Sequence, residues 1–183
     1  MKIVAYEVRE DEAEIMKKLA GKLGIDELVT TAEPLTLDTV HLAEGAAGVT
    51  TLGQSIIDEK VCQALKNVGV KGYSTRTVGY NHVNLKAAAE AGIRVSNATY
   101  SPHGVAEYTV MLILMTLRNY KPALYRINVN DYSLNGLIGK ELHDMTVGII
   151  GTGKIGAAVI QNLSGFGCKL LAHSRHEDEN LKK

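Results

Sequence analysis

The 183 residues of this chain include twenty basic and twenty acidic side chains, so the formal net charge at neutral pH is zero. This balance, with no long block of one sign, excludes a protein whose main partner is nucleic acid or an anionic membrane. The 45% apolar content is enough for a globular core, whereas no apolar run is long enough to span a bilayer. The N-terminus begins a strand without the apolar region of a signal peptide, so we expect a cytoplasmic protein that binds a small molecule.

The first hundred residues alternate short apolar runs with helix-like segments. In the first of these helices Ile15, Leu19 and Leu23 recur at intervals of four and share one face. Strands are expected at 3–6, 48–51, 70–74 and 93–96, and helices at 11–23, 58–67 and 85–91. This alternation predicts an α/β fold, a flavodoxin-like doubly wound domain with parallel strands.

A domain boundary is expected near Ser101, where Pro102 precedes a long apolar helix at 105–117. We expect this helix to be mostly buried. The segment 119–140 has poor periodicity and contains several tyrosines, which is typical of a connection that crosses a surface or another subunit. The predicted domains are therefore 1–100 and 101–183.

The second domain contains a glycine-rich turn between an apolar strand and a helix. The strand is expected at 146–150, the helix at about 154–166 and a second strand at 168–173. This context favours the first part of a Rossmann dinucleotide-binding domain over a plain glycine-rich turn. Because such a domain ordinarily contains two halves, we expect this one to be truncated.

The turn itself has the spacing that a dinucleotide pyrophosphate requires. Gly151 permits the tight turn, Gly153 lets the backbone approach the phosphates, and Gly156 allows close packing of helix against strand. Lys154 and Ile155 complete the start of the helix, whose N-terminus favours an anion. We predict that these five residues bind the cofactor.

Two residues after the second strand bear on the choice of cofactor. The acidic residue expected about 20 positions after the turn, which would bind the adenosine ribose of NAD, is replaced by Ser174 and followed by Arg175. A guanidinium can pair with a 2′-phosphate, so NADP becomes at least competitive as the NAD(P) cofactor. The acidic run at 177–179 would oppose this preference if it folded back onto the site.

Three ordered segments connect the chain with a known family. They are Ser74 to Val83, Asn97 to Pro102, and Gly139 to Thr146, which leads into the glycine turn. This combination resembles the D-isomer-specific 2-hydroxyacid dehydrogenases, and most of all their D-lactate dehydrogenase branch with the pyruvate reductases of vancomycin-resistance clusters. The resemblance covers nearly the whole chain and implies a homodimer.

The resemblance also implies residues of a substrate site. Val78 and Gly79 match a loop whose backbone N–H groups hold the substrate carboxylate, and Tyr100 matches an aromatic residue that lines the pocket. An ordinary strand-to-helix turn and simple packing are the alternatives for the loop and the tyrosine. His82 and His103 are interpreted as a surface or packing residue and a helix-terminal residue.

No catalytic residue is assigned within the chain. The family's hydride chemistry requires an arginine, a histidine and a carboxylate, and the resemblance implies that all three lie beyond Lys183. Two functions therefore remain open. The first is reduction of a small 2-oxo acid by the full-length parent, with pyruvate to D-lactate favoured. The second is a catalytically inactive fragment that acts at most as a binding or oligomerisation module.

The remaining candidate chemistry is not expected to contribute a site. Cys62 and Cys168 lack a CxxC or zinc spacing and are interpreted as reduced thiols without a role. His173 and His176 have no metal-ligand partner at a useful spacing, so no metal site is predicted.

Overall fold

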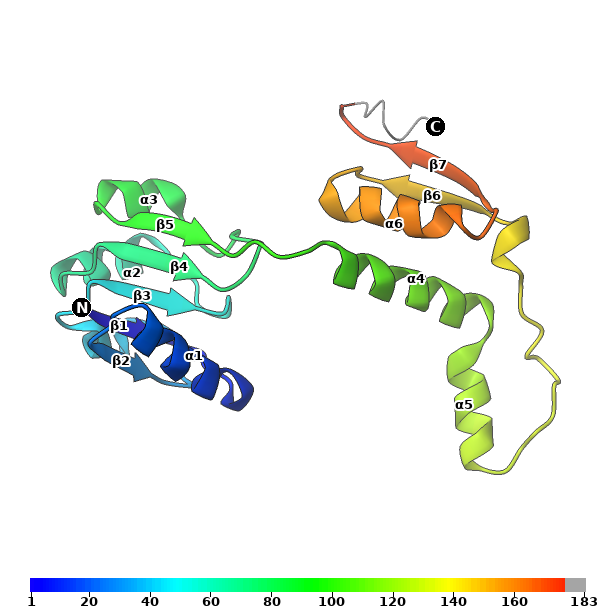
Figure 1. Ribbon diagram of the computed structural model, residues 1–183, viewed down its shortest axis with the longest axis horizontal. Helices are drawn as coiled ribbons and strands as arrows, with labels where there is room; N and C mark the ends of the chain where they lie inside the picture. Colours follow the sequence, from blue (N-terminus) through cyan, green and yellow to red (C-terminus); the bar gives the residue numbers. More distant parts are fainter. Residues whose placement is uncertain (177–183) are drawn as a thin grey trace. The chain divides into compact units, whose positions relative to one another are not determined.

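The computed structural model describes residues 1–176, and the chain divides into two compact units, Met1–Tyr100 and Ser101–Lys183. Figure 1 shows a sheet with its own helices in each unit. The α/β class predicted from the alternation of apolar runs and helices is confirmed.

The first unit is built on a five-stranded parallel sheet. The order β2-β1-β3-β4-β5 places the first strand inside the sheet, which is the flavodoxin-like arrangement. Its strands are β1 (Lys2–Ala5), β2 (Glu27–Thr30), β3 (Gly48–Thr51), β4 (Gly72–Thr75) and β5 (Arg94–Asn97). The edge strand β2, in which no residue is fully buried, was not predicted.

The helices of this unit begin where the sequence provides capping groups. Asp58 accepts a hydrogen bond from the N–H of Val61 at 2.9 Å, and Asn84 accepts one from the N–H of Ala87 at 3.0 Å. Each side chain satisfies a backbone donor that has no partner inside its helix. The helical elements are α1 (Glu10–Lys22), the 3-10 turn η1 (Val40–Ala43), α2 (Glu59–Asn67) and α3 (Leu85–Glu90).

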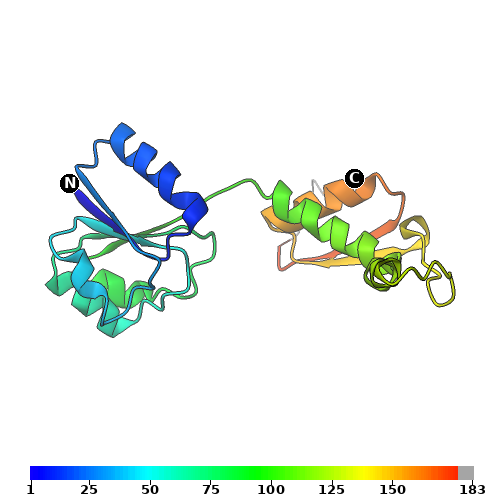
Figure 2. The ribbon, with the colours of Figure 1, turned by 90° about the horizontal axis from the view of Figure 1, so that it is seen from below.

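The main core lies between the sheet and helices α2 and α3. Val49 and Tyr73 of the strands are buried together with Cys62 and Leu65 of α2. Full burial of each large apolar side chain contributes about 1.5–3 kcal/mol relative to exposure. Figure 2 shows α1, in dark blue, on the opposite side of the sheet from α2 and α3.

The apolar stripe of α1 does not face this core. Ile15, Leu19 and Leu23 are all exposed, and the only buried residue of the helix is Ala20. Periodicity therefore predicted the helix correctly, whereas it did not predict which face of the helix would be buried against the sheet. An open groove of about 560 Å³ lies along β3, β4 and β5, lined by residues that include Ile3, Thr50, Ser74 and Ser96.

The second unit contains one strand–helix–strand sequence preceded by two helices. The parallel strands β6 (Thr146–Ile150) and β7 (Lys169–His173) are joined by α6 (Lys154–Ser164). Before them come α4 (His103–Leu117), α5 (Tyr120–Asn128) and the 3-10 turn η2 (Leu142–Asp144). The predicted strands and the helix between them are confirmed to within two residues at every end.

One expectation for the preceding segment is wrong, and one helix in it was not predicted. Helix α4 buries only Ala106 and Val110, because it packs along one stripe against α6 and its other faces have no cover within residues 1–176. The segment expected to be a connection across a surface or another subunit includes the helix α5, none of whose residues is buried.

The sheet of the second unit leaves apolar side chains uncovered, as expected for half of a doubly wound fold. Ile150 in β6 is 89% exposed and Leu171 in β7 is 53% exposed. Parallel strands are normally covered on both faces, so this surface favours association. Through residue 176, the chain has no helix with the length and apolarity needed to cross a membrane.

Candidate functional site

The turn after β4 holds two backbone carbonyls in place with side chains. The carbonyl of Val78 accepts a hydrogen bond from Asn97 Nδ2 at 2.8 Å. The carbonyl of Gly79 accepts one from Thr77 Oγ1 at 2.7 Å. Both carbonyls are therefore engaged by the protein, and the orientation of the peptide groups is fixed.

The N–H groups of the same two residues remain free. Within residues 1–176, neither the Val78 nor the Gly79 N–H donates a hydrogen bond to a protein acceptor. The side chain of Val78 is 39% exposed and Gly79 is also exposed. Two adjacent donors on an exposed turn can bind the two oxygens of a small carboxylate.

Sequence reasoning missed the two side chains that arrange this turn. Asn97 ends β5 and Thr77 lies two residues past β4, so both are at the carboxyl edge of neighbouring parallel strands. Ligands bind at that edge in open α/β sheets. In the sequence, the polar residue Asn97 directly after a predicted strand was the available indication of a role at this turn.

Tyr100 is the last residue of the first unit and is 60% exposed. Among the described residues its side chain makes no hydrogen bond, and none joins it to the Val78–Gly79 turn. Its role in lining a substrate pocket stays a prediction.

A buried carboxylate lies at the same edge of the sheet. Glu7, two residues past β1, is 4% exposed and accepts four backbone N–H bonds from Leu52–Ser55 and one bond from the Ser55 hydroxyl. Burial acts to raise the pKa of Glu7, but the hydrogen bonds outweigh it and the pKa lies below its ordinary value. Glu7 is therefore ionised at neutral pH.

The lowered pKa of Glu7 makes the stability of the first unit depend on pH. The carboxylate stabilises the fold fully above the unfolded-state pKa, near 4.5, and this contribution is lost as the pH falls through the lower folded pKa. We expect the urea midpoint of the native chain to drop below pH 4.5 more than that of Glu7→Gln. Urea unfolding from pH 7 to pH 3 measures this, and parallel pH profiles for the two proteins would contradict it.

The glycine turn after β6 has the geometry of a close helix–strand contact. Gly151 has φ of +94°, a left-handed conformation suited to glycine. A Cβ at Gly156 would overlap the carbonyl oxygen of Gly151, whereas a Cβ at Gly153 would meet nothing within 4 Å. The first glycine is thus favoured by its backbone conformation and the third by packing, and the second leaves room for a group to approach the backbone.

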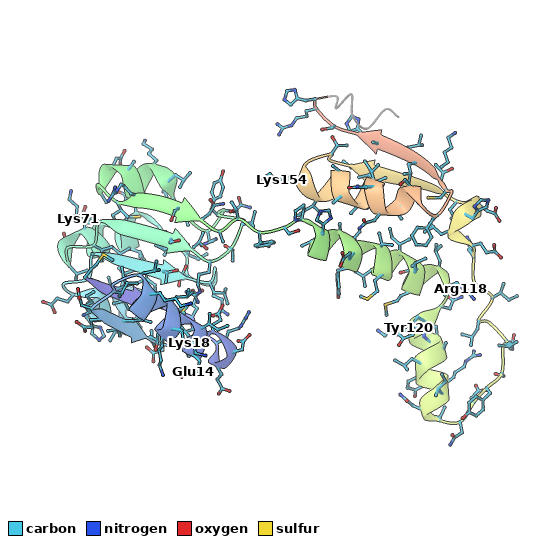
Figure 3. The ribbon with its side chains drawn as sticks, in the orientation of Figure 1. Glu14, Lys18, Lys71, Arg118, Tyr120 and Lys154 are labelled. Carbon is cyan, nitrogen blue, oxygen red and sulfur yellow. The ribbon has the colours of Figure 1, made fainter. Side chains whose placement is uncertain are left out.

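Helix α6 presents its N-terminus beside this turn. Lys154 is the first residue of the helix and is exposed (Figure 3). Gly153 occupies the N-cap and provides no side chain to satisfy the first N–H groups of the helix. A pocket of about 420 Å³ adjoins the turn and is lined by residues that include Gly151, Ile155 and Gly156. The site has the donors, the dipole and the space that a phosphate group needs.

Ser174 and Arg175 follow β7 at the same edge of the two-stranded sheet. The register pairs Ile150 with His173, and the N–H of Gly151 donates to the carbonyl of His173 at 2.8 Å. The structure thus brings these two residues to the edge that carries the glycine turn. The acidic run 177–179 lies outside the described residues.

Three further residues considered in the sequence, His103, Cys62 and Cys168, have no assigned role in a site. His103 is the first residue of α4, as predicted. Cys62 and Cys168 are free thiols, and burial raises the pKa of the Cys62 thiol. The described part of the chain contains no cluster of three or more side chains suited to holding a metal ion.

The family model for the D-isomer specific 2-hydroxyacid dehydrogenase catalytic domain matches residues 3–174, nearly the whole chain. The chain belongs to this family. The resemblance carried by the three sequence segments is therefore confirmed, and the conserved architecture accounts for both the sheet order of the first unit and the glycine turn of the second.

Three relatives illustrate the range of the family. The chain is 40% identical over its whole length to an aromatic 2-oxoacid reductase of Clostridium sporogenes, of which it covers 56%. A D-specific alpha-keto acid dehydrogenase of Enterococcus faecium is 42% identical over 94% of the chain, which covers 53% of that relative. The structure of a D-lactate dehydrogenase from Aquifex aeolicus, complexed with NAD and lactic acid, matches 98% of the chain with a TM-score of 0.86 at 25% identity and is itself 53% covered. The chain thus spans about half the length of the relatives it matches.

Proposed function

We propose that this chain forms the substrate-carboxylate turn and the pyrophosphate turn of an NAD(P)-dependent D-2-hydroxyacid dehydrogenase. The favoured reaction of the parent protein is reduction of pyruvate to D-lactate. The observation that supports this proposal is the free N–H groups of Val78 and Gly79. The carbonyls of these two residues already accept hydrogen bonds from Asn97 and Thr77, so only the N–H groups remain for a ligand. Residues 1–100 then act as the substrate domain and 101–183 as part of the cofactor domain.

The residues of the glycine turn fit a dinucleotide. Gly153 leaves open space above the start of α6, while Gly156 lets that helix lie against the turn. The backbone N–H groups of Lys154 and Ile155 would face the pyrophosphate, and the Lys154 ammonium would add a positive charge. The bound nicotinamide supplies a hydride to the substrate carbonyl carbon.

The protein groups orient the substrate for this transfer. The Val78 and Gly79 N–H groups hold the carboxylate, which sets the direction of the adjacent carbonyl. Tyr100 is proposed to pack against the rest of the substrate. The arginine, histidine and carboxylate that family membership implies are proposed to come from the part of the parent protein outside these 183 residues.

Binding of oxamate, an analogue of pyruvate, tests the substrate turn. In a ¹⁵N–¹H correlation spectrum of the chain we expect the Val78 and Gly79 signals to shift as oxamate is added. Gly79→Pro, which deletes one donor, should weaken binding about 10-fold or more, since a hydrogen bond to a charged group contributes roughly 1.5–3 kcal/mol.

Gly79→Ala is the matched control for this substitution. It keeps the N–H group, and a Cβ at this position meets nothing within 4 Å. Pyruvamide, which lacks the carboxylate, should leave the Val78 and Gly79 signals unmoved. Equal affinities of the alanine and proline variants for oxamate would contradict the proposed role of the N–H groups.

A larger substrate is the second candidate. The relative in Clostridium sporogenes is named an aromatic 2-oxoacid reductase, and its similarity extends over the whole chain. Competition between pyruvate and phenylpyruvate for the same two signals distinguishes the substrates. Oxidation of NADH or NADPH at 340 nm distinguishes an active chain from a binding or oligomerisation module.

A homodimer is proposed from the exposed apolar surface of the second unit. Tyr108 and Met111 of α4, Tyr125 of α5 and the following Ile138 are all solvent-exposed in the single chain. Exposed apolar side chains of this kind favour association. We expect sedimentation velocity to give twice the 19.7 kDa mass of the chain, and Ile138→Glu to shift it towards monomer.

Leu37→Glu is the control for this prediction, because Leu37 is an exposed leucine of the first unit. It introduces the same charge outside the second unit and should leave the dimer intact. A native chain that stays monomeric at every concentration would refute the proposal.

A further inference from the structure

The carboxylate of Glu7 accepts a hydrogen bond from every backbone N–H group of the neighbouring loop Leu52–Ser55. Its Oε2 accepts the N–H groups of Leu52 and Gly53 at 2.6 Å and that of Gln54 at 3.1 Å, and its Oε1 accepts the N–H of Ser55 at 2.6 Å. The Ser55 hydroxyl donates to the same Oε1. Four consecutive N–H groups that converge on one point form an anion-binding nest. In this protein the anion is a side chain of the chain itself.

The backbone of Glu7 is held in an unusual conformation. Its φ is +55°, in the left-handed region that residues other than glycine rarely adopt. Such a conformation persists only where the surroundings over-determine it, and it is enriched at functional sites. The surroundings include Arg76, whose Nη2 donates to the carbonyls of Tyr6 and Glu7 at 2.9 and 2.8 Å. Arg76 also pairs with Glu12 at 3.4 Å.

Arg76 links this arrangement to the substrate turn through the chain. It directly precedes Thr77, and its own N–H donates to the carbonyl of Thr51 at 2.7 Å. The hydroxyl of Thr77 in turn holds the carbonyl of Gly79. A hydrogen bond thus joins the backbone of Glu7 to Arg76, the residue directly before Thr77.

The loop organised by Glu7 also touches the turn directly. Gly53 lies so close to Thr77 that an added Cβ would be 3.2 Å from Thr77 Cγ2. The same Cβ would be 3.7 Å from Cε1 of His82, which follows the turn. Gly53 therefore faces both Thr77 and His82, the residues before and after the turn, and a loop displaced towards them would push against both.

We propose that Glu7 is a positioning residue for the substrate-carboxylate turn. Its carboxylate fixes Leu52–Ser55, and through Gly53 and Arg76 it holds the Val78 and Gly79 N–H groups in the orientation that binds a 2-oxo acid carboxylate. This inference rests on the proposed function of that turn.

Oxamate affinity in Glu7 variants tests the inference. Glu7→Gln preserves size but places an NH₂ group against backbone donors, and we expect it to weaken oxamate binding at the Val78 and Gly79 signals about tenfold. Glu7→Ala should do the same, and sodium formate should restore its affinity, because a formate ion can occupy the vacated nest. Sodium chloride at equal ionic strength should not restore it.

Val70→Ala separates positioning from general stability. Val70 is buried before β4, near the amino ends of the strands, so its truncation destabilises the core without contacting the loop. The inference predicts nearly native oxamate affinity in Val70→Ala under conditions where both variants are folded. Equal losses in Val70→Ala and Glu7→Gln, or no loss in Glu7→Gln, would overturn it.

A ligand-free measurement distinguishes failure of this inference from failure of the proposed function. If the native chain does not bind oxamate, the proposed function of the turn fails. Amide hydrogen exchange of Ala98, whose N–H donates to the carbonyl of Thr77 at the start of the turn at 3.0 Å, then tests the coupling by itself. Faster exchange in Glu7→Gln than in Val70→Ala supports the link from Glu7 to the turn, and equal exchange refutes it.

Discussion

Replacement of Gly156 by alanine is expected to abolish measurable binding of NADH and to destabilise the second unit. An alanine Cβ would overlap the carbonyl oxygen of Gly151, and both atoms belong to the turn that is proposed to face the pyrophosphate. Relief of the overlap requires α6 to move away from β6, at a cost of about 1–3 kcal/mol. The same movement carries the helix N-terminus away from the phosphates. Titration of NADH fluorescence and urea unfolding measure the two effects.

Gly165→Ala is the matched control, since it adds the same methyl group to the end of the same helix. Gly165 has a right-handed φ of −71°, and its Cβ would meet nothing within 4 Å. This variant should bind NADH normally and be equally or slightly more stable, by roughly 0.4–1 kcal/mol. If Gly156→Ala resembled this control, the close contact between helix and turn would have no role in binding.

Replacement of Ser174 by aspartate is expected to shift cofactor preference towards NADH by tenfold or more. Ser174 directly follows β7 at the edge that carries Gly151, where a carboxylate can accept hydrogen bonds from an adenosine ribose. The same carboxylate would repel the 2′-phosphate of NADPH. We expect Arg175→Ala to lower NADPH affinity alone, because the guanidinium pairs only with that phosphate. Parallel titrations with NADH and NADPH give the ratio.

Ser133→Asp introduces the same charge in an exposed loop of the second unit and should leave this ratio unchanged. A native chain that already binds NADH more tightly than NADPH would count against the proposed tolerance of NADP. A ratio that did not change in Ser174→Asp would show that the end of β7 does not contact the ribose.

Local patterns predicted most of the secondary structure because short-range physics decides it. The run Thr146–Ile150 followed by glycines predicted a strand and a tight turn, and both are present, although no residue of the strand is buried within the described part of the chain. The strand β2 and the helix α5 were not predicted, and neither buries a residue in the described part of the chain. Burial of α4 was overestimated, because hydropathy states what a helix can bury and not whether a partner is present.

The residues of the candidate site also divide into those that the sequence predicted and those that only the tertiary structure revealed. The sequence by itself determined the family and the glycine turn and predicted a role for Val78 and Gly79, because each depends on residues that are adjacent in the chain. Only the tertiary structure revealed how that turn is held. Asn97 lies 19 residues from Val78, and Glu7 lies 45 or more residues from the N–H groups that it binds. Parallel strands bring their carboxyl ends to one edge of a sheet irrespective of distance along the chain, so contacts between those ends depend on strand order and register, which local patterns do not specify.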